Sequence, residues 1–219
     1  MNLANKLTIF RIILVPIFVI IGYLGTAAGI FNNQVLGIAL YLIIMDVIFI
    51  IASITDKLDG YIARSRNQVT AFGKFLDPLA DKVVIIIMLF LMVWSAQFLD
   101  RGYILYPHDV LVLALIGGLI TTRELVVSIF RAVAAAKNVV LAADVFGKFK
   151  TIFLDVGMTV LIMAPVKAPN IPYFFAWAGT IIFYIGAVLA IYSGINYIVK
   201  NKQVLKEAEP THEEEKKED

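Results

Sequence analysis

The sequence predicts an all-α, polytopic membrane protein with about six transmembrane helices. Of its 219 residues, 60% are hydrophobic and 16% are charged, whereas soluble domains average about 45–50% and about 25%. Several apolar segments approach the roughly 20 residues that a helix needs to cross a bilayer. Cysteine is absent, which excludes disulfides and thiolate metal sites. We therefore expect an integral membrane protein, with membrane lipids around it and no nucleic-acid partner.

The predicted spans follow one another with short connections. In chain order they are 8–25, 35–55, 75–98, 109–130, 150–166 and 172–199. The first is expected to be retained, because its apolar run is too long for a signal peptide and no small-residue cleavage site follows it. Gly, Pro and Asn in 25–33 and 164–172 predict short turns. Residues 1–199 are expected to form one membrane domain, followed by a charged, disordered tail at 200–219.

The distribution of lysine and arginine predicts the orientation. One side of the predicted topology carries Lys6, Arg11, Lys57, Arg64, Arg66, Lys74, Lys82, Arg123, Arg131, Lys137, Lys148 and Lys150. The opposite side carries only Arg101 and Lys167. Because basic residues concentrate in cytoplasmic loops, both termini are expected in the cytoplasm.

The segment DKLDGYIARSRNQVTAFGKFLDPLADK, residues 56–82, concentrates charge between two apolar spans. Offsets of 0, 3, 4, 7 and 8 place its first five notable residues on one helical face: Asp56, Asp59, Gly60, Ala63 and Arg64. Gly73, Asp77 and Asp81 are spaced by four and form a second ridge. Two antiparallel helices joined by a turn near 67–71 would bring the ridges together. Pro78 is tolerated best if the second helix has only just begun.

Four facing carboxylates repel one another, so a positive charge is expected among them. Oxygen ligands without Cys or His suit Mg²⁺ or Mn²⁺, and two ions fit a phosphoryl-transfer site. Gly60 and Ala63 leave room for a bulky group, and Arg64 is placed to contact a phosphate oxygen. The alternative is a set of solvated acidic residues at helix ends, which the match between two ridges disfavours. The sequence therefore predicts a metal–diphosphate site.

The pattern D-x2-D-G-x2-A-R-x8-G-x3-D-x3-D is complete here and resembles the signature of the CDP-alcohol phosphotransferase family. The resemblance implies six membrane helices, a cytoplasmic active site, two divalent cations and commonly a homodimer. It also implies transfer of a phosphatidyl or similar group from a CDP-linked donor to an alcohol, with release of CMP. The implied metal ligands are Asp56, Asp59, Asp77 and Asp81. Asp81 is the implied general base.

Three further segments, NKLTIFR (5–11), TRELVVSIFR (122–131) and GKFKT (147–151), resemble the phosphatidylglycerophosphate synthase branch of that family. This resemblance implies CDP-diacylglycerol as donor, glycerol 3-phosphate as acceptor and a bacterial cytoplasmic membrane as location. The implied donor-binding residues are Asn5, Thr8, Asp56, Asp59, Gly60, Ala63, Arg64 and Gly73. The implied acceptor phosphate-binding residues are Arg11, Arg123, Arg131, Lys148 and Lys150.

The basic residues also make sense without the resemblance, because an anionic acceptor needs a positive pocket beside the carboxylates. The alternative is contact with anionic lipid headgroups, which we favour for Lys137. Other acceptors remain open: phosphatidylglycerol, inositol phosphate and serine. A cation transporter is less favoured, because its carboxylates would lie near the bilayer midplane. Asp46 and Asp155 lie within predicted spans, where functional carboxylates occur, but protonated or hydrogen-bonded helix contacts are favoured for both.

Overall fold

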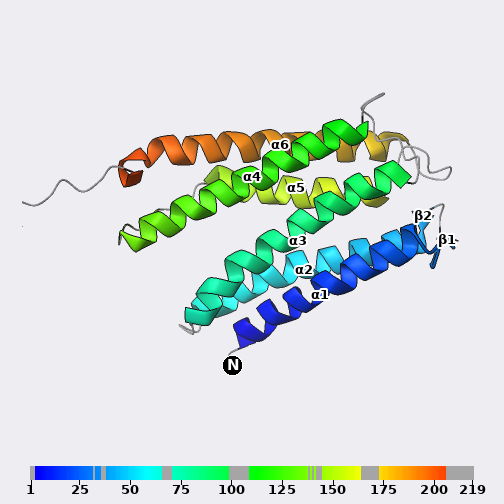
Figure 1. Ribbon diagram of the computed structural model, residues 1–219, viewed down its shortest axis with the longest axis horizontal. Helices are drawn as coiled ribbons and strands as arrows, with labels where there is room; N and C mark the ends of the chain where they lie inside the picture. Colours follow the sequence, from blue (N-terminus) through cyan, green and yellow to red (C-terminus); the bar gives the residue numbers. More distant parts are fainter. Residues whose placement is uncertain are drawn as a thin grey trace, which may run out of the picture.

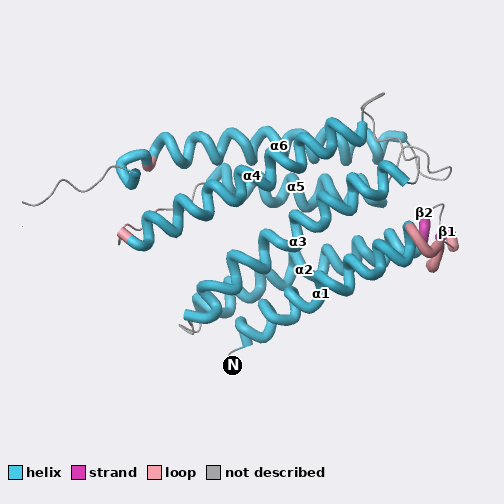
Figure 2. The backbone as a smooth tube through the Cα atoms, viewed as in Figure 1, coloured by secondary structure: helices cyan, strands magenta, loops and turns pink. Residues whose placement is uncertain are grey.

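The computed structural model describes residues 3–31, 33–35, 38–65, 71–98, 109–137, 139, 141, 145–163 and 173–205. Its elements, in order, are α1 (Leu3–Thr26), β1 (Gln34–Val35), β2 (Ile38–Ala39), α2 (Leu40–Ser65), α3 (Ala71–Phe98), α4 (Asp109–Ala136), α5 (Val145–Met163), α6 (Tyr173–Lys200) and a short 3-10 helix (Lys202–Leu205). Helices make up nearly all of the described chain (Figures 1 and 2). The predicted all-α class is confirmed.

Three of the described helices are long and apolar enough to cross a membrane: Lys6–Thr26, Leu111–Ala136 and Phe174–Lys200. Large apolar side chains on these helices face outward, and Phe174 and Val188 of α6 are 72% and 65% exposed. Extended exposed apolar surface of this kind marks contact with a membrane. The chain is therefore an integral membrane protein, while the count of six spans stays a prediction.

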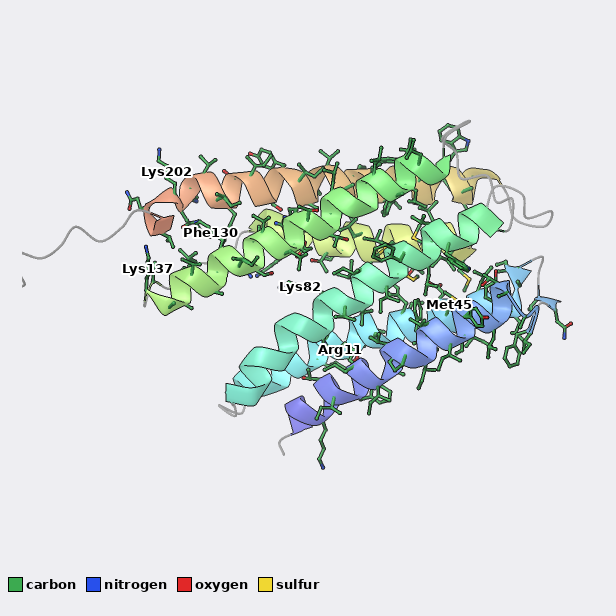
Figure 3. All side chains as sticks on the ribbon, in the orientation of Figure 1. Arg11, Met45, Lys82, Phe130, Lys137 and Lys202 are labelled. Atoms are coloured by element: carbon green, nitrogen blue, oxygen red, sulfur yellow. The ribbon has the colours of Figure 1, made fainter. Side chains whose placement is uncertain are left out.

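The helices form two groups of three (Figure 1). In one group α1 packs against α2 and α3, and in the other α6 packs against α4 and α5. Contacts between α2 and α5 and between α3 and α4 join the groups. The start of α1, the end of α2, the start of α3, the end of α4, the start of α5 and the end of α6 lie toward the same end of the bundle (Figure 1). Lys137, one of the basic residues from which we predict the cytoplasmic side, lies toward that end (Figure 3).

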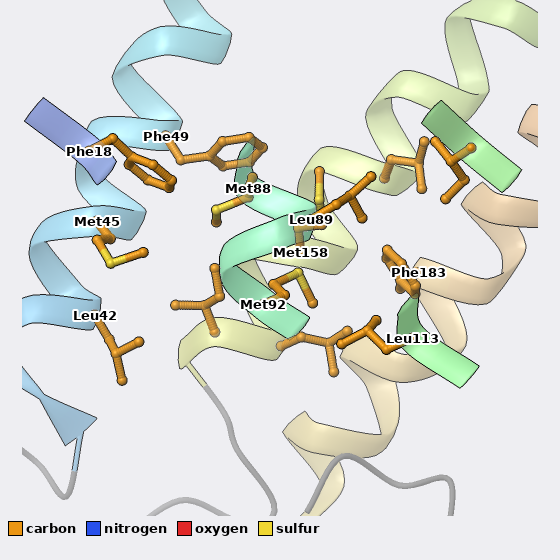
Figure 4. Close-up of a cluster of buried hydrophobic side chains, with 14 of the residues drawn as sticks. Phe18, Leu42, Met45, Phe49, Met88, Leu89, Met92, Leu113, Met158 and Phe183 are labelled. Carbon is orange, nitrogen blue, oxygen red and sulfur yellow. The ribbon is translucent and has the colours of Figure 1, made fainter. Parts of the chain in front are cut away.

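A sulfur-rich core fills the space between the two groups (Figure 4). Met45 of α2, Met88 and Met92 of α3 and Met158 of α5 are all buried. Methionine is unbranched and flexible, so it fills irregular gaps between packed helices. Met88 and Met92, four residues apart, present one face of α3 to this core.

Glycines bring α5 and α6 close together. A Cβ atom on Gly157 would lie 2.6 Å from the backbone of Phe183, and one on Gly186 would lie 2.8 Å from the backbone nitrogen of Leu154. Small residues at such contacts allow the close backbone approach on which helix packing in membranes depends. The position of α5, which carries several site residues, is therefore set by its contact with α6.

The chain turns before α2 through a hairpin instead of continuing as helix. Gly29 and Phe31 have positive φ angles of 68° and 60°, and β1 then pairs with β2 in antiparallel register. The predicted span 35–55 therefore starts too early and its first boundary is wrong, because a short apolar run does not distinguish strand from helix.

The polar ends of several helices extend past the apolar segments that predict them. The third helix begins at Ala71 rather than 75, so Pro78 lies in its third turn and the expectation that the helix had only just begun there is wrong. Likewise, α4 continues to Ala136 and α5 begins at Val145. Apolar composition indicates the membrane-embedded part of a helix, whereas backbone hydrogen bonding continues into the polar residues beyond it.

Candidate active site

The Asp-rich segment lies on two helices, as predicted. Asp56, Asp59, Gly60, Ala63 and Arg64 belong to the last turns of α2, which is helical without interruption to Ser65. The second ridge, Gly73, Asp77 and Asp81, lies on the first turns of α3. The helical spacing of both ridges is thus confirmed. Apart from Asp56, the side chains of these residues lie outside the described set, so their convergence stays a prediction.

Arg11 of α1 forms an ion pair with the first aspartate of the motif. Its Nη1 donates to Oδ1 of Asp56 at 2.5 Å, and the two side chains are 1% and 34% exposed. Figure 3 places Arg11 where α1 faces α2 and α3. Thr8, one turn earlier on the same face of α1, is fully buried. A buried guanidinium requires an opposing charge, and Asp56 provides it.

A polar cavity surrounds this ion pair at the junction of α1, α2, α3 and α5. It holds about 300 Å³ of space, part of it open to solvent. Its lining residues are Arg11, Ala52, Ser53, Asp56, Val84, Ile85, Thr151 and Asp155. Asp155 is only 9% exposed and lies on α5, one turn after Thr151. The cavity therefore joins two carboxylates, two hydroxyls and one guanidinium from separate helices.

An apolar cleft adjoins the polar cavity. It holds about 230 Å³ of space between α1, α2 and α3, part of it open to solvent, and all of its lining residues that the structure describes are apolar. Ala52 and Val84 line both spaces. A ligand with a polar group and an apolar chain would therefore find both environments side by side.

A second charged cluster joins α4, α5 and α6. Glu124 accepts hydrogen bonds at Oε1 from Arg123, at 2.7 Å, and from Lys150. Arg123 also donates to the hydroxyl of Ser193 at 2.7 Å. Lys150 directly precedes Thr151 of the polar cavity, so α5 connects the cluster to the cavity. Two of the predicted acceptor-binding residues, Arg123 and Lys150, are thus brought together, with Glu124 between them.

Arg131 of α4, also predicted to bind the acceptor, has a different partner. The guanidinium of Arg131 stacks over the ring of Tyr197, 5.0 Å from its centre, and its Nε donates to the Tyr197 hydroxyl at 3.2 Å. Two helical turns separate Arg131 from Arg123, and Lys148 is exposed. Arg11, also predicted to bind the acceptor, lies instead against Asp56.

The chemistry of the polar cavity suits a hard divalent cation. Its described donors are all oxygen atoms, from Asp56, Asp155, Ser53 and Thr151, and oxygen ligands select Mg²⁺ or Mn²⁺ over softer metals. Within the part of the chain whose side chains the structure describes, no three acidic or imidazole groups come together. Three of the predicted ligands, Asp59, Asp77 and Asp81, fall outside that part. The described residues fit a cation, and Asp56 is the predicted ligand among them.

Comparison with known proteins identifies the family. The model of the CDP-alcohol phosphatidyltransferase family matches residues 1–192. The chain belongs to this family. A protein of Bacillus subtilis is 34% identical over 205 residues, covering 94% of this chain and 97% of its own. Proteins of Wigglesworthia glossinidia brevipalpis and Escherichia coli K12 are 30% and 32% identical, each over 90% of this chain and 93% of their own. All three are named CDP-diacylglycerol–glycerol-3-phosphate 3-phosphatidyltransferase.

In this CDP-alcohol phosphatidyltransferase, two acidic residues outside the Asp motif lie at the candidate site in positions that the sequence did not predict. Asp155 lines the cavity, and its position within an apolar segment was the available signal for a functional carboxylate; its interpretation as a helix contact stays a prediction. Glu124 lies in the segment TRELVVSIFR, but nothing in the neighbouring sequence indicates that it pairs with two cations. Asp46 is fully buried and faces Thr159 across the α2–α5 interface, although neither carboxylate oxygen makes a hydrogen bond of ordinary geometry among the described residues. The favoured interpretation of Asp46 as a helix contact agrees with this position.

Proposed function

We propose that this chain transfers the phosphatidyl group of CDP-diacylglycerol to glycerol 3-phosphate, producing phosphatidylglycerophosphate and CMP. The observation that carries the proposal is identity of 30–34% with bacterial proteins of that name over at least 90% of the chain. Such coverage includes the α4 and α5 segments as well as the Asp motif. Family membership also favours an enzyme over a cation transporter.

The two adjoining spaces support a lipid donor. The diphosphate of CDP-diacylglycerol would lie in the polar cavity beside Asp56, with Arg64, Gly60 and Ala63 contacting the nucleotide. An acyl chain would begin in the apolar cleft, which Ala52 and Val84 share with the cavity. Burial of each methylene contributes about 0.8 kcal/mol, so such a cleft favours a lipid over a water-soluble CDP-alcohol.

The cluster on α4 and α5 supports an anionic acceptor. Arg123 and Lys150 share one carboxylate, that of Glu124, so the three side chains carry a net positive charge. Glu124 orients both cations, and their remaining N–H groups would bind the phosphate of glycerol 3-phosphate. Because Lys150 and Thr151 are consecutive, the acceptor would lie next to the donor cavity. Arg131 and Lys148 would contribute less directly, through the positive field at this end of the bundle.

The proposed reaction is an in-line displacement without a covalent enzyme intermediate. Asp81 takes the proton of the acceptor hydroxyl, whose oxygen forms a bond to the phosphorus of the phosphatidyl group. The bond from that phosphorus to the oxygen of CMP breaks, and CMP leaves with the electron pair. Two divalent cations at the Asp motif would neutralise the charge that grows on the phosphoryl oxygens. A cytoplasmic active site and a homodimer complete the proposal.

The test is product identification with purified protein. Given CDP-diacylglycerol and a panel of labelled alcohols, the protein should convert glycerol 3-phosphate to phosphatidylglycerophosphate, with CMP formed in equal amount. Asp81→Asn should retain binding of CDP-diacylglycerol and lose about 10²–10⁴-fold in turnover, as expected for loss of a general base. Lys137→Ala is the matched control, because Lys137 donates to the carbonyl of Val204 at 2.9 Å and has no proposed role in the reaction.

Two outcomes would contradict the proposal. Products formed from serine, inositol phosphate or phosphatidylglycerol but not from glycerol 3-phosphate would assign the chain to another branch of the family. Near wild-type turnover in Asp81→Asn would instead remove Asp81 as the base while leaving the substrate assignment intact.

A further inference from the structure

The interface between α2 and α5 carries a carboxylate, that of Asp155, which no step of the proposed transfer uses. Asp155 lies far along the chain from the Asp motif, yet it lines the same cavity as Arg11 and Asp56. Its side chain is 9% exposed. Thr151, one turn earlier on α5, lines the cavity as well, so this face of α5 is turned toward the predicted cation site.

Three charged side chains are among the described residues that line the cavity: one guanidinium and two carboxylates. Arg11 is the cation, and Asp56 and Asp155 are the carboxylates. A guanidinium presents five N–H donors in a planar fork, so it can bind two carboxylates at once. Because Arg11 is 1% exposed, its buried charge is costly without an opposing carboxylate close by.

Asp56 has two competing tasks. In the structure its Oδ1 accepts a hydrogen bond from Arg11 at 2.5 Å. A divalent cation bound to Asp56 uses the same carboxylate and places further positive charge beside the guanidinium, which repels it. The ion pair and the cation therefore weaken each other unless a second carboxylate takes over Arg11. Asp155, on the α5 side of the cavity, is the second carboxylate among the described lining residues.

We propose that Asp155 is a positioning residue that holds the Arg11 guanidinium while Asp56 binds a divalent cation. Its effect on the reaction is exerted through Arg11 and not by direct contact with the cation or the substrates. Asp155 thereby raises the affinity of the site for cations, because it removes Arg11 as a competitor for Asp56. The inference rests on the cation site of the proposed function, but not on the identity of the acceptor.

The test is a double-mutant cycle on cation binding, measured with Mn²⁺ alone. Full-length protein in detergent is titrated with Mn²⁺, and the free ion is followed by electron paramagnetic resonance without donor or acceptor. Asp155→Asn should raise the Kd for Mn²⁺ about tenfold, which corresponds to ~1.4 kcal/mol. Arg11→Gln removes the competitor, so adding Asp155→Asn to it should leave the Kd unchanged. Asp46→Asn is the matched control, since it removes a buried carboxylate from the same helix interface away from the cavity.

The cycle separates this role from the alternatives. A tenfold loss of affinity from Asp155→Asn that persists in the Arg11→Gln background would make Asp155 a direct ligand and overturn the proposal. An unchanged Kd in folded Asp155→Asn protein would overturn it too. If Asp155→Asn alone does not fold, the Arg11→Gln variant is compared with the double variant that carries both changes. Equal Kd values for Mn²⁺ support the proposal. Weaker binding by the double variant, or its failure to fold, refutes it. Wild-type protein that binds Mn²⁺ but makes no phosphatidylglycerophosphate would refute the proposed function alone.

Discussion

Gly157 lies where α6 crosses α5, and replacing it with alanine tests the packing that positions the site. The added Cβ would lie 2.6 Å from both the backbone nitrogen and the Cα of Phe183, and 2.9 Å from its Cβ. The end of a side chain could rotate away from the new Cβ, but these backbone atoms cannot. To reach an ordinary contact of about 3.5 Å, the two helices must separate by about 1 Å at this point.

The expected cost follows from this overlap. Overpacking a close contact costs typically about 1–3 kcal/mol, while alanine in a helix gains about 1 kcal/mol over glycine. Gly118→Ala on α4 is the matched control, because a Cβ there meets no atom within 4 Å and only the gain applies. The difference in free energy of unfolding between the two variants should therefore be about 1–3 kcal/mol, with Gly157→Ala the less stable.

Unfolding in detergent micelles, followed by circular dichroism during heating or denaturant titration, measures this difference. For a chain of this size, a loss of about 2 kcal/mol corresponds to a fall in Tm of roughly 4–8 °C. Because α5 carries Lys150, Thr151 and Asp155, the protein that remains folded should also bind glycerol 3-phosphate more weakly. Equal stability of Gly157→Ala and Gly118→Ala would show that α5 and α6 are not in the close contact described here.

Two further changes test the substrate-binding residues. Arg123→Ala should raise the KM for glycerol 3-phosphate about 10–100-fold and hardly change the KM for CDP-diacylglycerol. Steady-state kinetics with each substrate varied in turn measures both values. Lower stability with both KM values unchanged would show that Arg123 serves only a structural role, through its contacts with Glu124 and Ser193. Gly60→Leu should weaken binding of a CDP-containing ligand in an equilibrium titration while the protein stays folded, because the added bulk lies on the predicted donor face of α2. Unchanged affinity would mean that this face of α2 does not meet the donor.

Much of the site could be predicted from sequence because its signals are local. Apolar composition located all six helices to within a few residues in most places, and the spacing of Asp56, Asp59, Asp77 and Asp81 defined two helical ridges without any tertiary information. The sequence errors occurred at boundaries, at the hairpin before α2 and at the early start of α3. There, backbone hydrogen bonding and not hydrophobicity decides where a helix begins.

Only the tertiary structure decided which charges meet. Arg11 reaches Asp56 across 45 residues of sequence, Asp155 enters the same cavity from α5, and Glu124 lies between Arg123 and Lys150. Such pairings depend on how the helices pack, and in a membrane that packing is driven by close van der Waals contact at small residues and not by a hydrophobic stripe. Helical periodicity places a residue on one face of its own helix. It does not determine which residue of another helix lies opposite that face. Here the close approach of α5 to α6 at glycine contacts and the packing of α5 against α2 determine these pairings.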